Sequence, residues 1–298
     1  MRTISAVLTI AIAALPAAAQ DPPKKYDLKF TEKLSPGQRL ACSETGSMNM
    51  TATFFTDGKP VKKENSTGFS CEYLMEVLKC RGHRAAEAKW TLSKATRRDK
   101  GTESPCGFAG KTLLVTWDED GKKTIRYEQG AELTAEDLET AKELHASGIK
   151  TPRGQPSGYE VFGPKEPVAV GDSWTPDIKA LAAVTGKANF QFDMKSSTAT
   201  AKLKSVDQRG GSEFGNVVVD LELYLTNLNG LKLDEPLMMK LGFELDACID
   251  GRVTQGAMKM KIVMKGSSSA TIPGSGEKAE FEFDTTGDRS IDIRPAKP

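Results

Sequence analysis

Alternation of apolar and polar residues is the dominant pattern along this chain. In residues 217–225 every second residue is apolar, and Asp220 and Glu222 occupy intervening positions. The same alternation runs through 241–247 and 48–54. A period of two is typical of strands that bury one face. We therefore predict a mainly β protein of long, twisted antiparallel strands, which form either one continuous curved sheet or two similar halves, such as half-barrels.

Turn signals separate these strands. Asp-Gly pairs at 57–58, 120–121 and 250–251 are typical of tight hairpins, because glycine accepts the positive φ that such turns require. In the last predicted hairpin, residues 258–265 set methionines on one face and lysines on the other. We expect a loop over 266–276 and then a strand whose acidic residues, Asp284 among them, lie beside the lysines.

One helix is predicted around 134–147, with Thr134 as its N-cap and acidic residues in its first turn. Residues 151–166 are rich in Pro and Gly, which indicates a linker or long loop. We predict an N-terminal β-rich half over 20–150 that contains the helix, and a C-terminal β-rich half over 167–298.

Two short motifs resemble a known group of proteins. The stretch Pro167-Val-Ala-Val-Gly-Asp-Ser-Trp174 and the opening Tyr26-Asp-Leu-Lys-Phe30 are similar to elements of a family of secreted bacterial β-rich proteins of unknown function. The specific match covers about 20 residues, and the predicted order of strands fits the same group along the rest of the chain. This resemblance implies an architecture and an envelope location, and no chemistry. Many members carry a lipid-bearing cysteine that is lacking here.

Residues 1–19 have the features of a cleaved signal peptide. Arg2 precedes the apolar run 4–15, and small residues follow Pro16. That run is too short to span a bilayer, which needs about 20 apolar residues. We expect a secreted protein, periplasmic or extracellular, with no transmembrane segment after cleavage.

Charge gives no indication of a nucleic-acid partner. The chain has 41 basic and 40 acidic residues, and Arg2 would leave with the leader. Nucleic-acid binders show basic patches or stripes, which a balanced chain does not suggest. The hydrophobic and charged fractions, 38% and 27%, are those of a folded globular protein.

Five cysteines raise the question of disulfides. In an oxidising compartment, clustered cysteines suggest two bonds among the first four, with three connectivities open. We favour Cys42–Cys80 and Cys71–Cys106, because a hairpin register of 55 opposite 67 sets 42 opposite 80. Cys248 is left over, as a buried thiol or a handle for an intermolecular bond.

No residue is nominated as catalytic, as a metal ligand or as a cofactor ligand. Only two histidines occur, His83 in a basic turn and His145 near the helix end, and there is no G-x-S-x-G nucleophile motif. The acidic stretch 118–121 lacks the further ligands of a calcium loop and indicates a charged turn. The strand methionines could supply thioethers for Cu(I), but we interpret them as packing residues.

The methionine-rich apolar stripes suggest a function in binding. A strongly curved sheet must cover its concave face, and these stripes either fill that space or line an apolar cavity. We expect six residues to face a bound apolar ligand or lipid: Met258, Met260, Met264, Val219, Leu221 and Leu223. The leading hypothesis is a non-enzymatic envelope protein. The alternatives are a structural or assembly protein that engages an envelope partner, and a hydrolase without a recognisable motif.

Overall fold

The computed structural model describes residues 23–28, 33–56, 59–82, 84–119, 121–144, 161–180, 190–228, 230–271 and 278–296. The predicted signal peptide, the first ten residues of the predicted linker, His83 and His145 lie outside these ranges.

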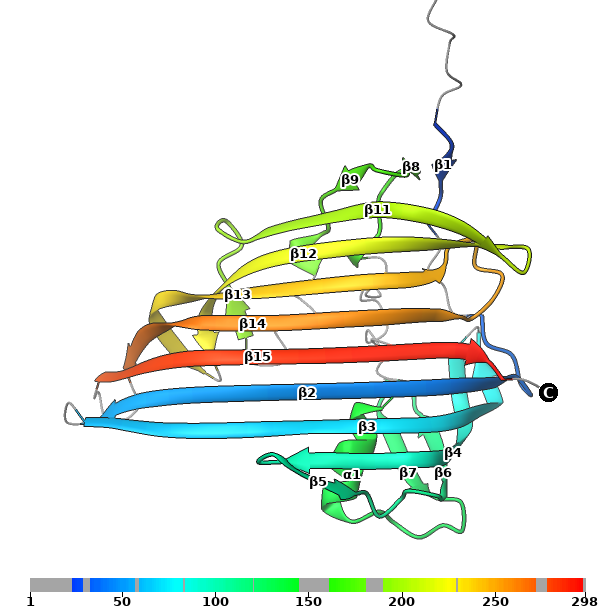
Figure 1. Ribbon diagram of the computed structural model, residues 1–298, viewed down its shortest axis with the longest axis horizontal. Coiled ribbons are helices and arrows are strands. Elements are labelled where there is room, and N and C mark those ends of the chain that lie inside the picture. The colour runs from blue at the N-terminus through cyan, green and yellow to red at the C-terminus, as the bar shows by residue number, and fades with distance from the viewer. Residues whose placement is uncertain are drawn as a thin grey trace, which may run out of the picture.

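The mainly β prediction is confirmed. The long strands form one continuous antiparallel sheet of 13 strands, in the order β7-β6-β4-β3-β2-β15-β14-β13-β12-β11-β9 along its main path (Figure 1). In sequence order the strands are β2 (Arg39–Thr56), β3 (Lys59–Arg81), β4 (Arg84–Asp99), β5 (Thr102–Pro105), β6 (Thr112–Trp117), β7 (Lys123–Tyr127), β9 (Ser173–Trp174), β10 (Phe190–Phe192), β11 (Thr198–Arg209), β12 (Ser212–Leu228), β13 (Leu231–Cys248), β14 (Gly256–Thr271) and β15 (Lys278–Pro295).

The chain crosses this sheet as two meanders that meet in the middle. The first runs outward from β2 to β7, the second inward from β11 to β15, and β15 pairs with β2. This pairing extends from Phe55 opposite Glu280 to Leu40 opposite Pro295. A separate two-stranded sheet joins β1 (Lys25–Tyr26) to β8 (Val168–Ala169).

Two of the predicted hairpins differ in detail. In the β2–β3 hairpin Phe55 lies opposite Pro60 rather than residue 67, so the turn is tighter than predicted. Strand β14 continues through Thr271, so residues 266–271, predicted as loop, are paired with β15. The predicted charge ladder is present at Lys265, whose Nζ lies 2.9 Å from Asp284 Oδ2.

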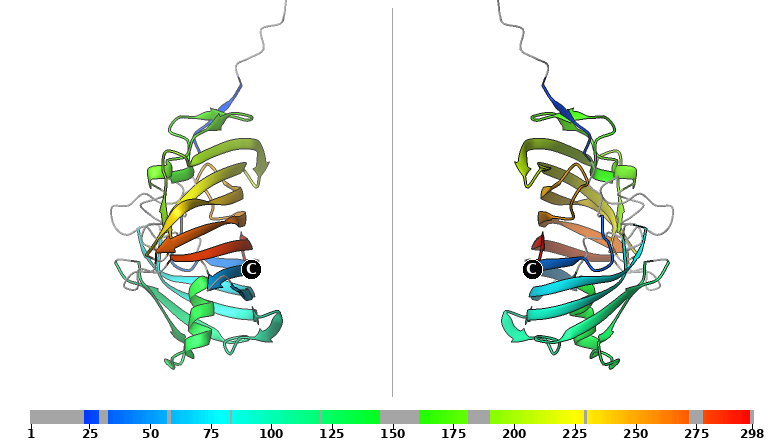
Figure 2. Two further views of the ribbon diagram at one scale, coloured as in Figure 1. Left: turned by 90° about the vertical axis from the view of Figure 1, so that its left-hand side faces the viewer. Right: turned by 90° about the vertical axis from the view of Figure 1, so that its right-hand side faces the viewer.

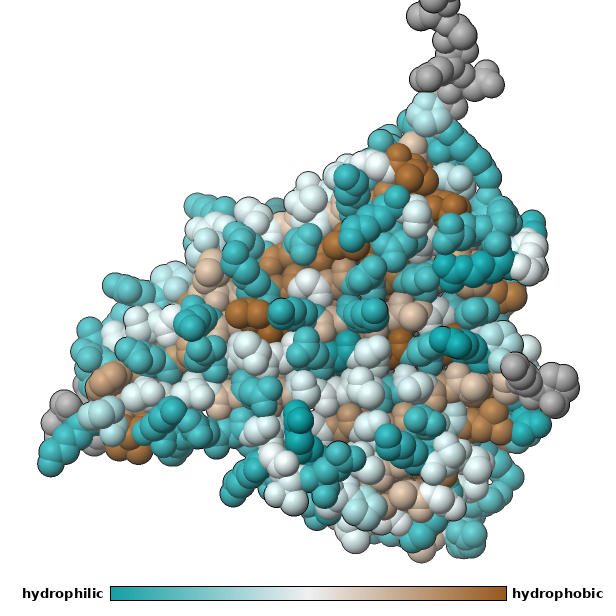
Figure 3. Space-filling view, viewed as in Figure 1, coloured by the Kyte–Doolittle hydropathy of each residue, from teal (hydrophilic) through white to brown (hydrophobic). Residues whose placement is uncertain are grey.

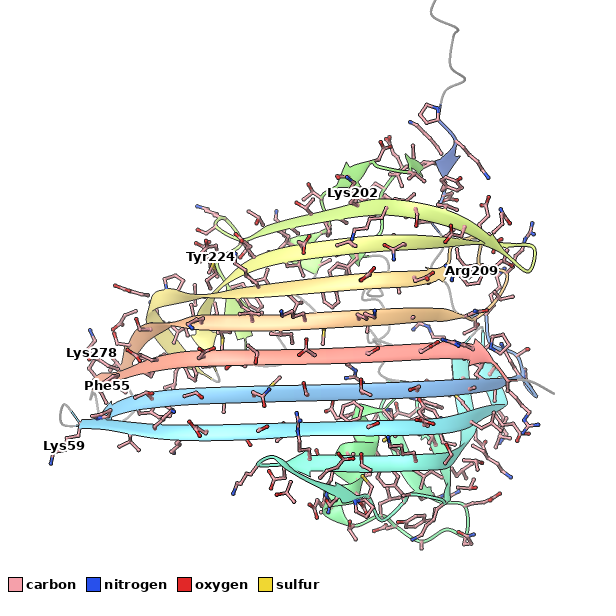
Figure 4. The ribbon with its side chains drawn as sticks, in the orientation of Figure 1. Phe55, Lys59, Lys202, Arg209, Tyr224 and Lys278 are labelled. Atoms are coloured by element: carbon pink, nitrogen blue, oxygen red, sulfur yellow. The ribbon has the colours of Figure 1, made fainter. Side chains whose placement is uncertain are left out.

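The sheet has one apolar and one polar face, because side chains alternate along every strand. The apolar face is the concave one, and α1 (Ala135–Glu143) lies on that side (Figure 2). The polar face is turned to the viewer in Figure 1, and hydrophilic residues predominate there over β14, β15 and β2 (Figure 3). Lys202 and Tyr224 belong to it by register (Figure 4).

Separate clusters of buried side chains cover the two ends of the apolar face. One cluster packs β2–β6 against α1 and the turn around Phe108, with Trp90 fully buried. A second packs β11–β13 beneath residues 161–180, where Phe162 stacks on Phe243 with 5.3 Å between ring centroids. A smaller third cluster gathers around Phe281. The middle parts of the central strands β14, β15 and β2 lie between the first two clusters, while the ends of β2 and β15 contribute to the first and third clusters.

The predicted helix is present at its predicted place. Thr134 is the N-cap, and its Oγ1 accepts from the backbone N–H of Asp137 at 3.2 Å. Asp137 is itself buried and accepts from the backbone N–H of Gly107 at 2.9 Å. A Cβ at position 107 would lie 2.3 Å from Asp137 Oδ2. Glycine is therefore required where the 105–110 turn meets the helix.

Candidate functional site

At the centre of the apolar face, methionine side chains lie on both sides of small residues of β15. We call Met48, Met50, Met260, Ile262 and Met264 the methionine strip. Its members flank β15 on both sides, from β2 and from β14, and point to the concave face.

The register aligns the strip in two rows across the sheet. In one row Thr285 lies between Met264 and Met50, and in the next Gly287 lies between Ile262 and Met48. Since threonine and glycine are small, the long side chains on both sides stand above them. A Cβ built on Gly287 would lie 3.7 Å from Met48 Cε.

The strip is less buried than the clusters beside it. Met48 is 43% exposed, whereas Trp90 and Leu203 in the flanking clusters are fully buried. Met260, Ile262 and Met264 are half-buried. Flexible thioether chains adapt to irregular apolar partners. The strip is therefore an apolar surface that the described residues cover only in part.

A buried ionic group adjoins the strip. Glu44 is 1% exposed, and its Oε1 accepts from Tyr73 Oη at 2.5 Å. Arg289 lies opposite Met260, and its Nη2 is 3.3 Å from Glu44 Oε2. Burial, together with the Glu44 charge, raises the pKa of Tyr73 well above its usual value. The pairing compensates charges that would be costly to bury alone.

Two cations fasten the C-terminal end of α1 to this group. Lys123 Nζ donates to the carbonyls of Leu144, at 2.5 Å, and Lys142, at 3.0 Å. Arg289 donates to the carbonyl of Glu143 and lies 3.5 Å from its carboxylate. Cations favour a helix C-terminus, where carbonyls are left without helical partners. Burial nevertheless lowers the pKa of Lys123 to about 8.

Two polar atoms on this face of β15 lack hydrogen-bond partners in the described part of the chain. They are Nε of Arg289 and Oγ1 of Thr285, and both are buried. Thr285 is 6% exposed, with methionines opposite it on both neighbouring strands. A buried donor without an acceptor is costly. These atoms are the polar groups that a ligand on the strip could satisfy.

The six residues proposed for ligand contact all lie on the apolar face, in two different settings. Met258, Met260 and Met264 are half-buried on β14. Val219, Leu221 and Leu223 on β12 are buried in the second cluster, at 4%, 2% and 1% exposure. Contact with a ligand stays a prediction for all six, and the β14 residues are the more accessible set.

Sequence reasoning missed Glu44, Arg289 and Thr285. A signal was present, because Glu44 occupies the apolar phase of β2 between Cys42 and Gly46. Arg289 likewise shares the phase of Ile291. A charged residue in the apolar phase of a strand indicates a buried pair, but its partner is seen only after the strands are placed.

The predicted disulfides are absent, because no two of the five cysteines lie within disulfide distance. Cys42 lies opposite Tyr73, and Cys80 lies near the far end of β3, so the register that supported Cys42–Cys80 is wrong.

The second predicted pair is separated by a strand. Cys71 lies opposite Ala95 on β4, and the Cys106 N–H donates to the Ala95 carbonyl from the other side. The two Cα atoms are thus two strand spacings apart, about 10 Å, beyond the roughly 7 Å that a disulfide allows. Burial raises the pKa of Cys71 to about 12 and of Cys106 to about 11.

Cys248 is buried, and its Sγ lies 3.0 Å from Asp250 Oδ1. This thiol is therefore poorly placed for an intermolecular bond.

The two motifs that carry the family resemblance are in contact with each other. Tyr26 of β1 pairs with Val168 of β8. Gly171 turns the chain at φ 96°, and Trp174 pairs with Ala201 of β11 while its Nε1 donates to the Phe162 carbonyl at 2.8 Å. The motif therefore attaches the N-terminal strand to the edge of the sheet, which is a structural role.

Other features give no second site. Lys122 N–H donates to Asp118 Oδ1 at 2.7 Å in the β6–β7 turn, as expected of a charged hairpin. A shallow depression of about 420 Å³ on the polar face, near the Arg294–Asp292 ion pair, does not meet the strip. Within the described ranges no three His, Cys, Asp or Glu side chains are placed to hold a metal ion. No helix there has the length and apolarity to cross a membrane.

Comparisons with known proteins leave the family open. No family model matches the chain, and no curated protein matches it. A protein of family DUF1329 from Desulfovibrio piger is 10% identical over 84% of this chain and 85% of its own, with a TM-score of 0.13. The COG4313 outer membrane channel from Pseudomonas putida F1 is 9% identical over 89% and 99%, with a TM-score of 0.20. Such low TM-scores support no argument about fold or function.

Proposed function

We propose that this protein is a non-enzymatic protein of the bacterial envelope that binds the apolar chain of a lipid on the methionine strip. The observation that carries the proposal is the partly exposed strip at the centre of the concave face, between two fully packed clusters. An apolar surface framed by polar groups is typical of a ligand site. The predicted signal peptide supports the envelope location.

The apolar surface and the flexibility of the methionine strip suit a chain-like ligand. Burying apolar surface contributes about 25 cal/mol per Å². The half-buried thioethers offer that surface and can move to follow a flexible chain. A rigid polar substrate would find few partners there, since the charges nearby are already paired with one another.

Neighbouring residues on β14 provide a matched test. Ile262 belongs to the methionine strip, while Val263 points to the polar face opposite Lys240 and Thr286. In Ile262→Glu we expect displacement of N-phenyl-1-naphthylamine by long-chain lipids to be lost, because a carboxylate would lie in the path of the chain. Val263→Glu should bind as the wild type does.

Native mass spectrometry of the protein purified from its own envelope, followed by solvent extraction, would identify a retained lipid. Equal binding by the two variants, or no binding of any chain by the wild type, would contradict the proposed function.

The alternatives have less support. Engagement of a partner through Cys248 is disfavoured by the burial of that thiol. The buried carboxylate of Glu44 is held by Tyr73 and Arg289, an arrangement that suits a structural role better than hydrolysis.

A further inference from the structure

A buried polar atom beside the methionine strip suggests which lipid the strip binds. Arg289 leaves the sheet opposite Met260 on one side and Gly46 on the other. The Phe69 ring lies over Gly46, where an added Cβ would be 2.5 Å from it, and the guanidinium stacks on this ring at 5.6 Å. Glycine at 46 thus makes room for the ring that supports Arg289.

Among the described residues, the hydrogen bonds of the guanidinium are all made by its two terminal nitrogens. Nη1 and Nη2 are directed to Glu44 and Glu143. Nε is buried and has no acceptor among the described residues. Among the described residues this Nε–H therefore has no acceptor, and by register it lies beside Met260, whose flexible side chain can move aside.

The charges around this N–H are balanced. Glu44 and Glu143 accompany Arg289 and Lys123 in the same cluster. A ligand carboxylate would lie close to the buried Glu44, whereas a neutral carbonyl oxygen would accept the hydrogen bond without adding charge. The free group thus favours an uncharged acceptor over an anion.

We propose that the ligand is an acyl ester, whose carbonyl oxygen accepts a hydrogen bond from Nε of Arg289 while its alkyl chain lies along the methionine strip. This inference rests on the proposed function and adds the class of ligand. The proposal assigns the hydrogen bond to Arg289 and not to Thr285, whose Oγ1 is the other buried atom on this face of β15 without a partner among the described residues.

A pair of probes isolates the carbonyl. 1-Monolauroylglycerol and 1-O-dodecylglycerol differ only in the ester carbonyl, and both are used below their critical micelle concentrations. In displacement of N-phenyl-1-naphthylamine from the wild type, we expect the ester to bind about tenfold more tightly than the ether, as one hydrogen bond to a charged donor predicts. Laurate should bind more weakly than the ester.

Two variants assign the donor. Arg289→Lys keeps the charge beside Glu44 and removes the Nε–H, so the ester should lose its tenfold preference over the ether in this variant. Thr285→Val should retain the tenfold preference. The preference is measurable on the wild type even if Arg289→Lys does not fold.

Each other outcome is decisive. Equal affinity of ester and ether in the wild type, tighter binding of laurate, a preference retained by folded Arg289→Lys, or a preference lost in Thr285→Val would overturn the inference. Binding of the ether alongside any of these would leave the proposed function standing. Failure of both probes to displace the dye would instead contradict the proposed function itself.

Discussion

Polar residues in the apolar phase of strands are the informative exceptions at the residue scale. Glu44 is buried with Tyr73 and Arg289 as partners, so its charge is compensated. Thr285 is 6% exposed, more deeply buried than the methionines opposite it, and its hydroxyl has no partner in the described ranges. The Glu44 side chain therefore helps to hold β2 to its neighbouring strands, whereas the unpaired Thr285 hydroxyl lowers the free energy of unfolding.

Replacement of Thr285 by valine should therefore stabilise the protein. Valine keeps the branched shape and removes a buried hydroxyl, so we expect the free energy of unfolding to rise by about 1 kcal/mol. Thr286→Val is the control, because Thr286 is exposed on the polar face and its change should stay within about 0.5 kcal/mol. Urea unfolding of both variants measures the difference. A less stable Thr285→Val would mean that the hydroxyl has a partner in the folded protein.

At the scale of elements, α1 is held at both ends by buried side chains. Asp137 joins its first turn to the turn at Gly107, and Lys123 and Arg289 hold its last carbonyls. The helix is short, and isolated helices of that length are marginal in water. Its stability thus depends on these attachments and on the burial of Ala141 and Leu144.

The Lys123 attachment should depend on pH. Burial lowers the pKa of Lys123 to about 8, against 10.5 for an unperturbed lysine. Between these values the unfolded chain binds more protons than the folded one, so the free energy of unfolding rises with pH, by at most about 1.4 kcal/mol per unit. The Lys123 contribution is complete above pH 10.5 and declines as the pH falls through 8.

Comparison with Lys123→Met isolates this contribution. We expect the wild type to gain stability relative to the variant when the pH is raised from about 7.5 to about 10, across the window that linkage predicts. Lys122→Met, at the exposed neighbouring position, should show no such difference. Chemical denaturation at both pH values measures it, and a wild-type advantage that shrinks with rising pH would contradict the assignment.

At the scale of the whole molecule, the pairing of β2 with β15 joins the two halves predicted from the sequence. The N-terminal cluster includes Ile291 and Ile293 of β15, and the third cluster combines Phe54 of β2 with Phe281. Neither half completes its own core. The predicted halves therefore describe the order of the chain, and we expect them to fold together as one unit.

Unfolding should consequently be one cooperative transition. Trp90 and Trp117 lie in the N-terminal cluster, so tryptophan fluorescence reports mainly on that half. Hydrogen exchange of β12 in the same urea series reports on the other. Because the clusters share strands, we expect coincident midpoints. Two separated transitions would show instead that the halves fold independently.

Local pattern was sufficient for the elements and insufficient for their partners. The alternation around Val219 and Met260 predicted strands and the face on which each side chain lies, because a period of two is a property of the extended backbone itself. The Thr134 cap and the Asp118 turn were equally local, since each depends on residues within one turn of chain.

The predicted β2–β3 register was wrong. The predicted Cys42–Cys80 bond was derived from that register, and Cys71–Cys106 was the pair that remained. The predicted and observed registers differ by an odd number of residues, so the predicted one sets Met50 of the apolar phase of β2 opposite Glu72 of β3. The alternation of β3, whose apolar phase includes Tyr73 and Met75, was sufficient to exclude that register.

By itself, the sequence determined the strand class, the helix and the apolar phase that holds the methionines. Only the tertiary structure decided that β2 and β15 meet at the centre of one sheet, which places Glu44 beside Arg289 across 245 residues of chain. The physical reason is range. Backbone geometry and capping act over a few residues, whereas burial and charge compensation depend on strands that the chain brings together only when it is folded.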